Sequence, residues 1–550
     1  NAAYKNKINY EVTRMKSSKA MKLIALLLVV AMAFSMLSAC GKTDDGQTPA
    51  DTQTDNKDTE NANDIIPEGA SEAAADSTVT IVIGADSGSL YPLANSQDMN
   101  SVMRCLYDVP ADTLSDGSRI FRLIESIDTI SETEYTLHLR QGVTFANGNP
   151  FTAEDFMFSA ELQYNDPQFF LNVKSLDLEK TNIVDEYTID FHITAFDPTV
   201  WTSMDMLYIF DAETFDADSL AATPNGTGPY ELVEYVSNSH ISFKAREDWW
   251  GGDIAIKNVN VLIMSEDTQK TNALITGDAQ YSSIPFKDVE YVSGLGYNTQ
   301  INASGGAYVA YLNASSDPSN PLNSPEARMA VYHAINCETI NNLTMEGQSE
   351  LTVWAGSSYF VDYEQRFADK SEAYKTGYDL EKAKELAEAS GLVGKTIRVM
   401  TNGGDTYVTM AEIIQGNLAE IGVNVEIKNY DQATYFSLLM DQSNYEIGLF
   451  MLVGSTCLGM DLMPVYAGMF YANTWEAYPD FAALGAKGMV TADEAARGDI
   501  MNEMVDILNR DFPWFTICEI AGATARASNL EGVEHYLDGL WHVAEWYYTE

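Results

Sequence analysis

The chain is poor in cysteine, histidine and basic residues for its 550 residues. Its five cysteines form no CxxC pair and no short cluster, which excludes a cysteine-rich metal site or a dense disulfide framework. The six histidines show no close spacing that would chelate a metal, so no metal and no cofactor are expected. With 80 acidic against 32 basic residues, the net charge is −48, and such a surface repels phosphate backbones. A nucleic-acid partner is therefore excluded.

Catalytic motifs are also missing, since no GxSxG elbow, HExxH helix or P-loop is present. The alternative of a secreted hydrolase with a carboxylate pair rests only on the abundance of acids. A hydrophobic content of 46% with 11% aromatics is enough for packed cores. Because single cores stop growing near about 250 to 300 residues, the length predicts two or more lobes.

The only long apolar run, Leu23 to Leu37, follows three lysines and is too short to span a membrane comfortably. This pattern predicts a signal peptide over residues 1–40, of which residues 1–14 precede the plausible starts and are set aside as upstream sequence. The run ends in Leu-Ser-Ala-Cys-Gly, which resembles the lipobox of bacterial lipoproteins, and that resemblance implies lipidation of Cys40. Residues 41–77 are acidic and nearly free of large apolar side chains, so they predict a disordered tether.

The body begins at Thr78 to Ile83, where polar and apolar residues alternate as in a half-buried strand. Later segments alternate between strand and helix patterns and predict a βαβ unit with a parallel strand pair. The predicted strands are 397–400, 423–427 and 445–453, and the predicted helices are 380–389 (capped by Asp379), 409–421 and 433–440. Ligands collect beyond the carboxyl ends of such strands, so residues 454–463 form a candidate ligand loop.

Two adjoining segments, Tyr135 to Phe145 and Asn147 to Asp155, resemble the peptide/nickel class of substrate-binding proteins of ABC transporters. Physically they read as a strand, a glycine turn and a helix that begins at Thr152 with acids in its first turn. Other segments agree with this family in order, namely Gly226–Tyr230, Trp250–Gly252, Tyr311–Asn313 and Pro321–Asn336. The resemblance covers residues 78–550.

The resemblance implies an α/β protein with a two-lobed periplasmic-binding-protein-like fold of the class II type, an extra domain, and mixed sheets flanked by helices. Lobe I is expected to be discontinuous, the extra domain to follow its first strands, and lobe II to be continuous. The expected boundaries are 78–118, 225–305 and 520–550 for lobe I, 119–224 for the extra domain, and 306–519 for lobe II.

The implied function is that of a non-enzymatic, extracytoplasmic lipoprotein, held by its lipid on the outer face of the bacterial cytoplasmic membrane. It would capture a small ligand, a peptide by this reading, and deliver it as a monomer to an ABC permease and its ATPase. The same role for an oligosaccharide, haem or chelated nickel stays open, as does presentation of the ligand to a membrane receptor.

Five residues are candidate ligand contacts. By family position, Asp461 could hold the ammonium group of a peptide, although an ordinary loop aspartate is an equal alternative. Asn95, Ser96 and Gln97 could hydrogen-bond a ligand or simply form a turn. Trp354 could line a side-chain pocket or pack in a core.

Overall fold

A computed structural model describes most of the chain after residue 76. The described residues are 77–94, 99–114, 119–166, 169, 173–315, 317–352, 354–356, 363–371, 374, 377–439, 442–453, 479–533 and 540–549.

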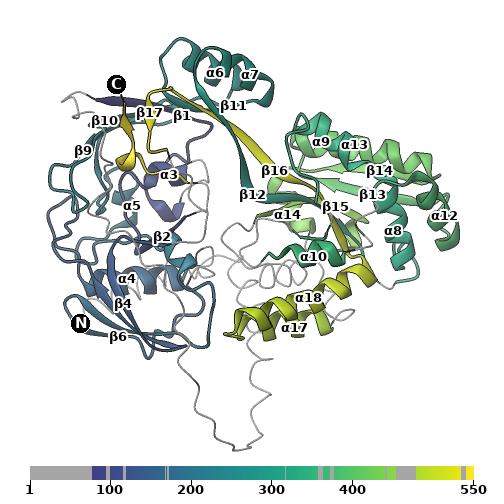
Figure 1. The fold of residues 1–550 in the computed structure, drawn as a ribbon, viewed down its shortest axis with the longest axis horizontal. Helices are drawn as coiled ribbons and strands as arrows, with labels where there is room; N and C mark the ends of the chain where they lie inside the picture. The colour runs from purple at the N-terminus through teal and green to yellow at the C-terminus, as the bar shows by residue number, and fades with distance from the viewer. Residues whose placement is uncertain are drawn as a thin grey trace, which may run out of the picture.

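One large mixed sheet runs through the described residues, and Figure 1 shows it passing from the N-terminal half to the C-terminal half of the chain. It has ten strands, in the spatial order β8 (Tyr230–Val236), β9 (His240–Ala245), β10 (Asn258–Ile263), β1 (Thr78–Ile83), β11 (Tyr281–Ile284), β16 (Trp514–Arg526), β12 (Asn298–Leu312), β15 (Ile447–Val453), β13 (Thr396–Thr401) and β14 (Asn424–Asn429).

Three main groups of buried apolar residues pack around this framework. The first core lies against β1, β9 and β10 and includes residues from both ends of the body, from Val79 to Trp546. The second core lies under a separate four-stranded sheet. That sheet has the order β4 (Ile124–Ser131), β5 (Glu134–Leu139), β7 (Thr188–His192) and β6 (Asn182–Asp185), and α4 (Ala153–Tyr164) packs with it. The third core is built from residues between Ala307 and Cys518.

The predicted βαβ unit is confirmed. Strands β13 and β14 pair in parallel, and α13 (Asp405–Glu420) connects them. Helix α12 (Leu380–Ser390) begins at the predicted cap, where the Asp379 side chain accepts a hydrogen bond from Lys382 N, and ends at Gly391 in the left-handed conformation. The expected α/β fold with mixed sheets is therefore confirmed.

The remaining elements cover the sheets or connect them. They are η2 (Pro92–Ala94), α3 (Asn100–Met103), β2 (Ala111–Thr113), β3 (Arg119–Phe121), η5 (Thr202–Met206), α5 (Ala217–Leu220), α6 (Asp267–Ile275), α7 (Phe286–Gly294), α8 (Pro325–Ala334), α9 (Cys337–Thr344), α10 (Gln365–Lys370), α14 (Gln432–Leu439), η6 (Gln442–Asn444), α17 (Pro479–Met489), α18 (Glu494–Asp511), β17 (Leu530–Glu531), η7 (Val543–Glu545) and β18 (Tyr547–Tyr548).

Two long strands, β12 and β16, run from the third core to a smaller buried cluster beside the first core, which includes Val82, Ile284 and Ala525. Strand β12 pairs antiparallel with β16 along most of its length, and its second half also pairs with β15. The β12–β16 register shifts between Ala303 and Ala307 and again between Tyr308 and Val309. In Figure 1 these two strands cross from the side of α6 and α7 to the side of β13 and β15.

Candidate ligand-binding region

Most of the predicted ligand contacts fall outside the described residues. This applies to Asn95, Ser96, Gln97 and Asp461, and also to the predicted lipidation site Cys40. These assignments stay predictions, but the described elements on either side of them are informative.

The predicted contacts Asn95 to Gln97 are flanked by η2 and α3, which belong to the first core. Ser101 on α3 accepts a hydrogen bond from Trp541 N at 3.3 Å, so the C-terminal segment fixes this short helix. The other candidate loop follows Val453, whose register partner in β12 is Gly306. Val453 is thus paired with β12 next to the register shift between Ala303 and Ala307.

Trp354 is described and lies in the third core, where only 2% of it is exposed. Its ring centroid is 5.6 Å from that of Tyr363 and 6.0 Å from that of Phe367. Packing against these two aromatic rings is enough to explain a tryptophan at this position. A ligand contact at Trp354 stays a prediction.

The family-like segments have clear structural roles. The Asp211 carboxylate accepts hydrogen bonds from the side-chain amides of Asn147 (2.7 Å) and Asn149 (3.0 Å), which fixes the turn before α4. At the start of α4, Thr152 and Asp155 form a capping box. These contacts explain the strand–turn–helix segment without any chemistry on a ligand.

The Gly226–Tyr230 segment packs its backbone directly on the backbone of residues 105–107. Gly228 N donates to Leu106 O at 3.0 Å, and Tyr230 N donates to Cys105 O at 2.9 Å. A side chain at Gly226 or Gly228 would place its Cβ within 2.4 Å of Leu106. Only glycine permits so close an approach.

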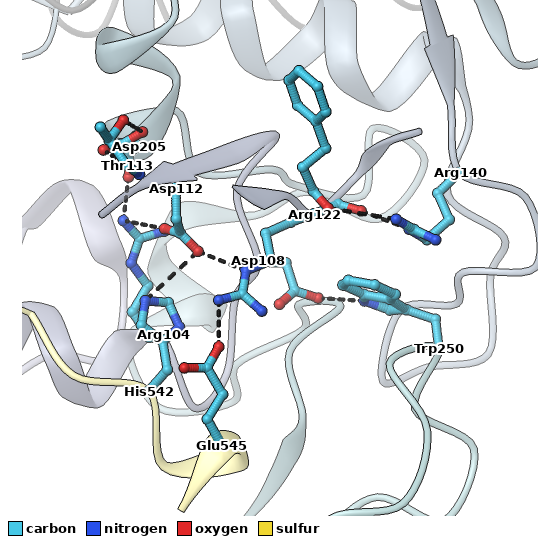
Figure 2. A network of polar contacts seen from close by, with 11 residues as sticks. Arg104, Asp108, Asp112, Thr113, Arg122, Arg140, Asp205, Trp250, His542 and Glu545 are labelled. Carbon is cyan, nitrogen blue, oxygen red and sulfur yellow. Dashed lines mark hydrogen bonds and ion pairs between the residues drawn. The ribbon is translucent and has the colours of Figure 1, made fainter. Parts of the chain in front are cut away.

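A network of buried charges lies next to this contact, and Figure 2 shows it. Arg122 donates to the Asp112 carboxylate (2.7 Å) and to the Glu545 carboxylate (2.6 Å), while Arg104 lies 3.6 Å from Asp112. Arg104 also donates to the Asp205 carbonyl. The network thus ties residues 104–112 to the edge of the second core and to the C-terminal segment.

Two groups of the network have strongly shifted pKa values. Burial opposes ionisation of Asp112, but His542, Arg104 and Arg122 outweigh it and lower the pKa of this carboxyl to about 2. Burial lowers the pKa of His542 to about 4, although Asp112 raises it. At neutral pH the network therefore contains a charged Asp112 and a neutral imidazole.

The cavity inside this network measures about 10 Å³ and is lined by Arg104, Arg122 and His542 among others. A volume of this size holds about one water molecule, so the network cannot enclose a peptide. Sequence reasoning missed the network, although a signal exists: Arg104 and Asp108 interrupt an otherwise apolar run, and charges buried in such runs are normally paired.

The described residues also bear on metal binding and on membrane insertion. They contain no group of three or more His, Cys, Asp or Glu side chains arranged to hold a metal ion. None of their helices is both long and apolar enough to cross a membrane.

Comparisons with known proteins assign the chain to a family. Residues 122–473, more than half of the chain, match the family described as bacterial extracellular solute-binding proteins, family 5 Middle. The haem-binding protein A of Haemophilus influenzae is 24% identical over 72% of this chain and 78% of its own length. The oligopeptide-binding protein OppA of Bacillus subtilis is 21% identical over 85% of this chain and 92% of its own length.

The crystal structure of the ABC transporter substrate-binding protein CtaP from Listeria monocytogenes has the same fold. It superimposes with a TM-score of 0.73 at 22% sequence identity, covering 86% of this chain and 99% of CtaP. The family binds and transports solutes and is not a family of enzymes, which agrees with the missing catalytic motifs. The chain belongs to the bacterial extracellular solute-binding proteins of family 5.

Proposed function

We propose that the chain captures peptides outside the cell, between the lobe of the first core and the lobe of the third core, and delivers them to an ABC permease. The observation that carries this proposal is the family match, together with the similarity over most of both chains to an oligopeptide-binding protein. The two joining strands, β12 and β16, support closure of the lobes by a hinge motion at the register shift near Ala303.

The lobe boundaries in this proposal are 78–118, 225–305 and 520–550 for lobe I, 119–224 for the extra domain, and 306–519 for lobe II. The third core, whose residues run from Ala307 to Cys518, supports the bounds of lobe II. The second core lies mostly within the range of the extra domain, although the first core also takes residues of that range, such as Phe158 and Phe210. The protein would work as a monomer, held by a lipid on Cys40 at the outer face of the cytoplasmic membrane. Replacing Cys40 by serine would release it from the membrane fraction.

The ligand can be tested by thermal unfolding of the purified protein after denaturation and refolding to remove carried ligand. A ligand that binds only the folded state stabilises it by about 2.7 kcal/mol at a hundredfold excess over Kd. We expect mixed di- to hexapeptides to raise Tm, and oligosaccharides, haem and chelated nickel to leave it unchanged. A response to haem alone, the ligand named for one relative, would replace peptide by haem and keep the binding role.

Asp461 can be tested in the same assay. We expect Asp461→Ala to abolish or weaken the peptide-induced shift, because the carboxylate would no longer meet the ligand's ammonium group. Asp253→Ala, at an exposed loop position, serves as the matched control and should retain the full shift. Equal shifts in both variants would remove Asp461 from the site.

A further inference from the structure

Trp250 lies between two cores. Its ring packs against the first core and against the second core. The indole Nε1–H donates to the Asp108 carboxylate at 2.7 Å, and the Arg140 guanidinium lies over the ring, 4.6 Å from its centroid. Figure 2 shows Asp108 between Arg122 and Trp250, with Arg140 close to the indole ring.

Backbone hydrogen bonds cross the same junction next to Asp108. Arg122 N and Ile124 N both donate to Pro110 O, at 3.0 and 3.2 Å, and Leu123 N donates to Val109 O at 3.4 Å. Residues 109–110 directly follow Asp108, while residues 122–124 lead into the four-stranded sheet. These bonds continue the antiparallel β2–β3 ladder toward Asp108, so an opening of the junction at this end of the ladder would expose the three amides beside the Asp108 carboxyl.

Asp108 is a buried carboxyl, only 8% exposed. The charged and titratable groups around it come from every neighbouring segment: Arg104, Asp112, Arg122, Arg140, His542 and Glu545. The nearest arginines are themselves engaged, because Arg122 donates to Asp112 and Glu545, and Arg140 donates to the Arg122 carbonyl. The charged form of Asp108 is thus only partly compensated.

We propose that Asp108 is a proton-binding latch between the first and second cores, which holds the junction more tightly when its carboxyl is protonated than when it is charged. The device is independent of which ligand the protein binds. It would make the coupling between the two cores sensitive to the pH outside the cell.

The direction of the pH effect follows from the linkage between proton binding by Asp108 and closure of the junction. Burial raises the pKa of Asp108 to about 6, against the opposing effects of Trp250 and Arg122. In an opened junction the carboxyl meets water and returns to its ordinary value of 3.8. The closed junction therefore binds the proton more tightly than the open one. Acidification from pH 7.5 to pH 5 should favour closure by about tenfold.

Hydrogen exchange of the three junction amides measures this opening directly. We expect protection factors at Arg122, Leu123 and Ile124, which already remove the intrinsic pH dependence of exchange, to be about tenfold higher at pH 5 than at pH 7.5 in the full chain. The increase should begin near pH 6 and continue to grow as the pH falls further toward 3.8. Equal protection factors at the two pH values in the unmodified protein would overturn the proposal.

Two variants separate Asp108 from other acids. In Asp108→Asn, which keeps an acceptor for the indole but cannot titrate, the tenfold difference should disappear. Asp155→Asn is the matched control, since burial also raises the pKa of Asp155 to about 6 although its partners are Thr152 and Ala212. This control should retain the difference. A difference that persists in Asp108→Asn, or is lost in Asp155→Asn, would also overturn the proposal.

Discussion

At the scale of single residues, Gly228 shows how a family-like segment acts through backbone packing. We expect Gly228→Ala to lower the free energy of unfolding by about 3 kcal/mol or to prevent folding, because its Cβ would lie 2.4 Å from the Leu106 carbonyl carbon. Chemical denaturation followed by circular dichroism measures the loss.

Gly416 provides a control for Gly228, because the same change to alanine is expected to raise the free energy of unfolding there. It is exposed within α13, and an added Cβ there would meet nothing within 4 Å. Gly416→Ala should therefore stabilise the protein by about 1 kcal/mol, since alanine is the better helix former. A destabilising Gly416→Ala, or a neutral Gly228→Ala, would contradict this account.

His542 predicts a pH dependence of stability. Its folded pKa of about 4 lies below its ordinary 6.5, so the unfolded chain binds a proton first as the pH falls. The contribution of the neutral His542 side chain to the free energy of unfolding is complete above pH 6.5 and is lost as the pH falls through 4. The loss between pH 7 and pH 4 is about 3 kcal/mol.

The variant His542→Gln isolates this contribution. Urea unfolding of both proteins from pH 4 to pH 7.5 should show the unmodified protein losing more stability on acidification than the variant. Asp108 and Asp155 titrate in the opposite sense but are present in both chains, so their effects cancel in the difference. Parallel pH profiles would contradict the assignment of a neutral, buried imidazole.

For single residues, the sequence predicted local backbone roles better than the partners that a side chain meets after folding. Asp379 was predicted as the cap of α12, because a capping role depends on local backbone conformation. The buried partners of Asp112 could not be predicted, because Arg104, Arg122 and His542 meet it only after distant segments pack.

At the scale of elements, α12 offers a test of local signals. Asp379→Ala removes the side-chain acceptor of Lys382 N, and we expect a loss of about 1 kcal/mol in unfolding free energy. Glu385→Ala, at an exposed position in the same helix, should change stability by less than about 0.5 kcal/mol. Equal losses in the two variants would show that the cap contributes nothing.

Strand β1 was predicted to both of its ends, whereas α13 begins four residues before the helix that its periodicity predicted and ends one residue earlier. The pairing of β12 with β16 was not predicted from the sequence, although it joins the two halves of the sheet. Local periodicity identifies a strand, but its partner is chosen by packing between residues about two hundred positions apart.

At the scale of the whole molecule, the charge of −48 predicts a salt-dependent stability. Repulsion among unpaired carboxylates disfavours the compact state, and salt screens it. Raising sodium chloride from 0.05 to 0.5 M should increase Tm by about 3 °C. Choline chloride should give the same increase, since screening depends on ionic strength. A constant or falling Tm would contradict this expectation.

The first core is built from both ends of the body. Strand β1 begins at Thr78, while Trp541 and Trp546 lie against each other and against Tyr281 in the same core. A chain that leaves the ribosome N-terminus first can thus complete its third core before its first. Completion of the first core waits for Trp541 to Trp546, so a nascent or truncated chain that lacks them presents an unfinished apolar surface to chaperones and proteases.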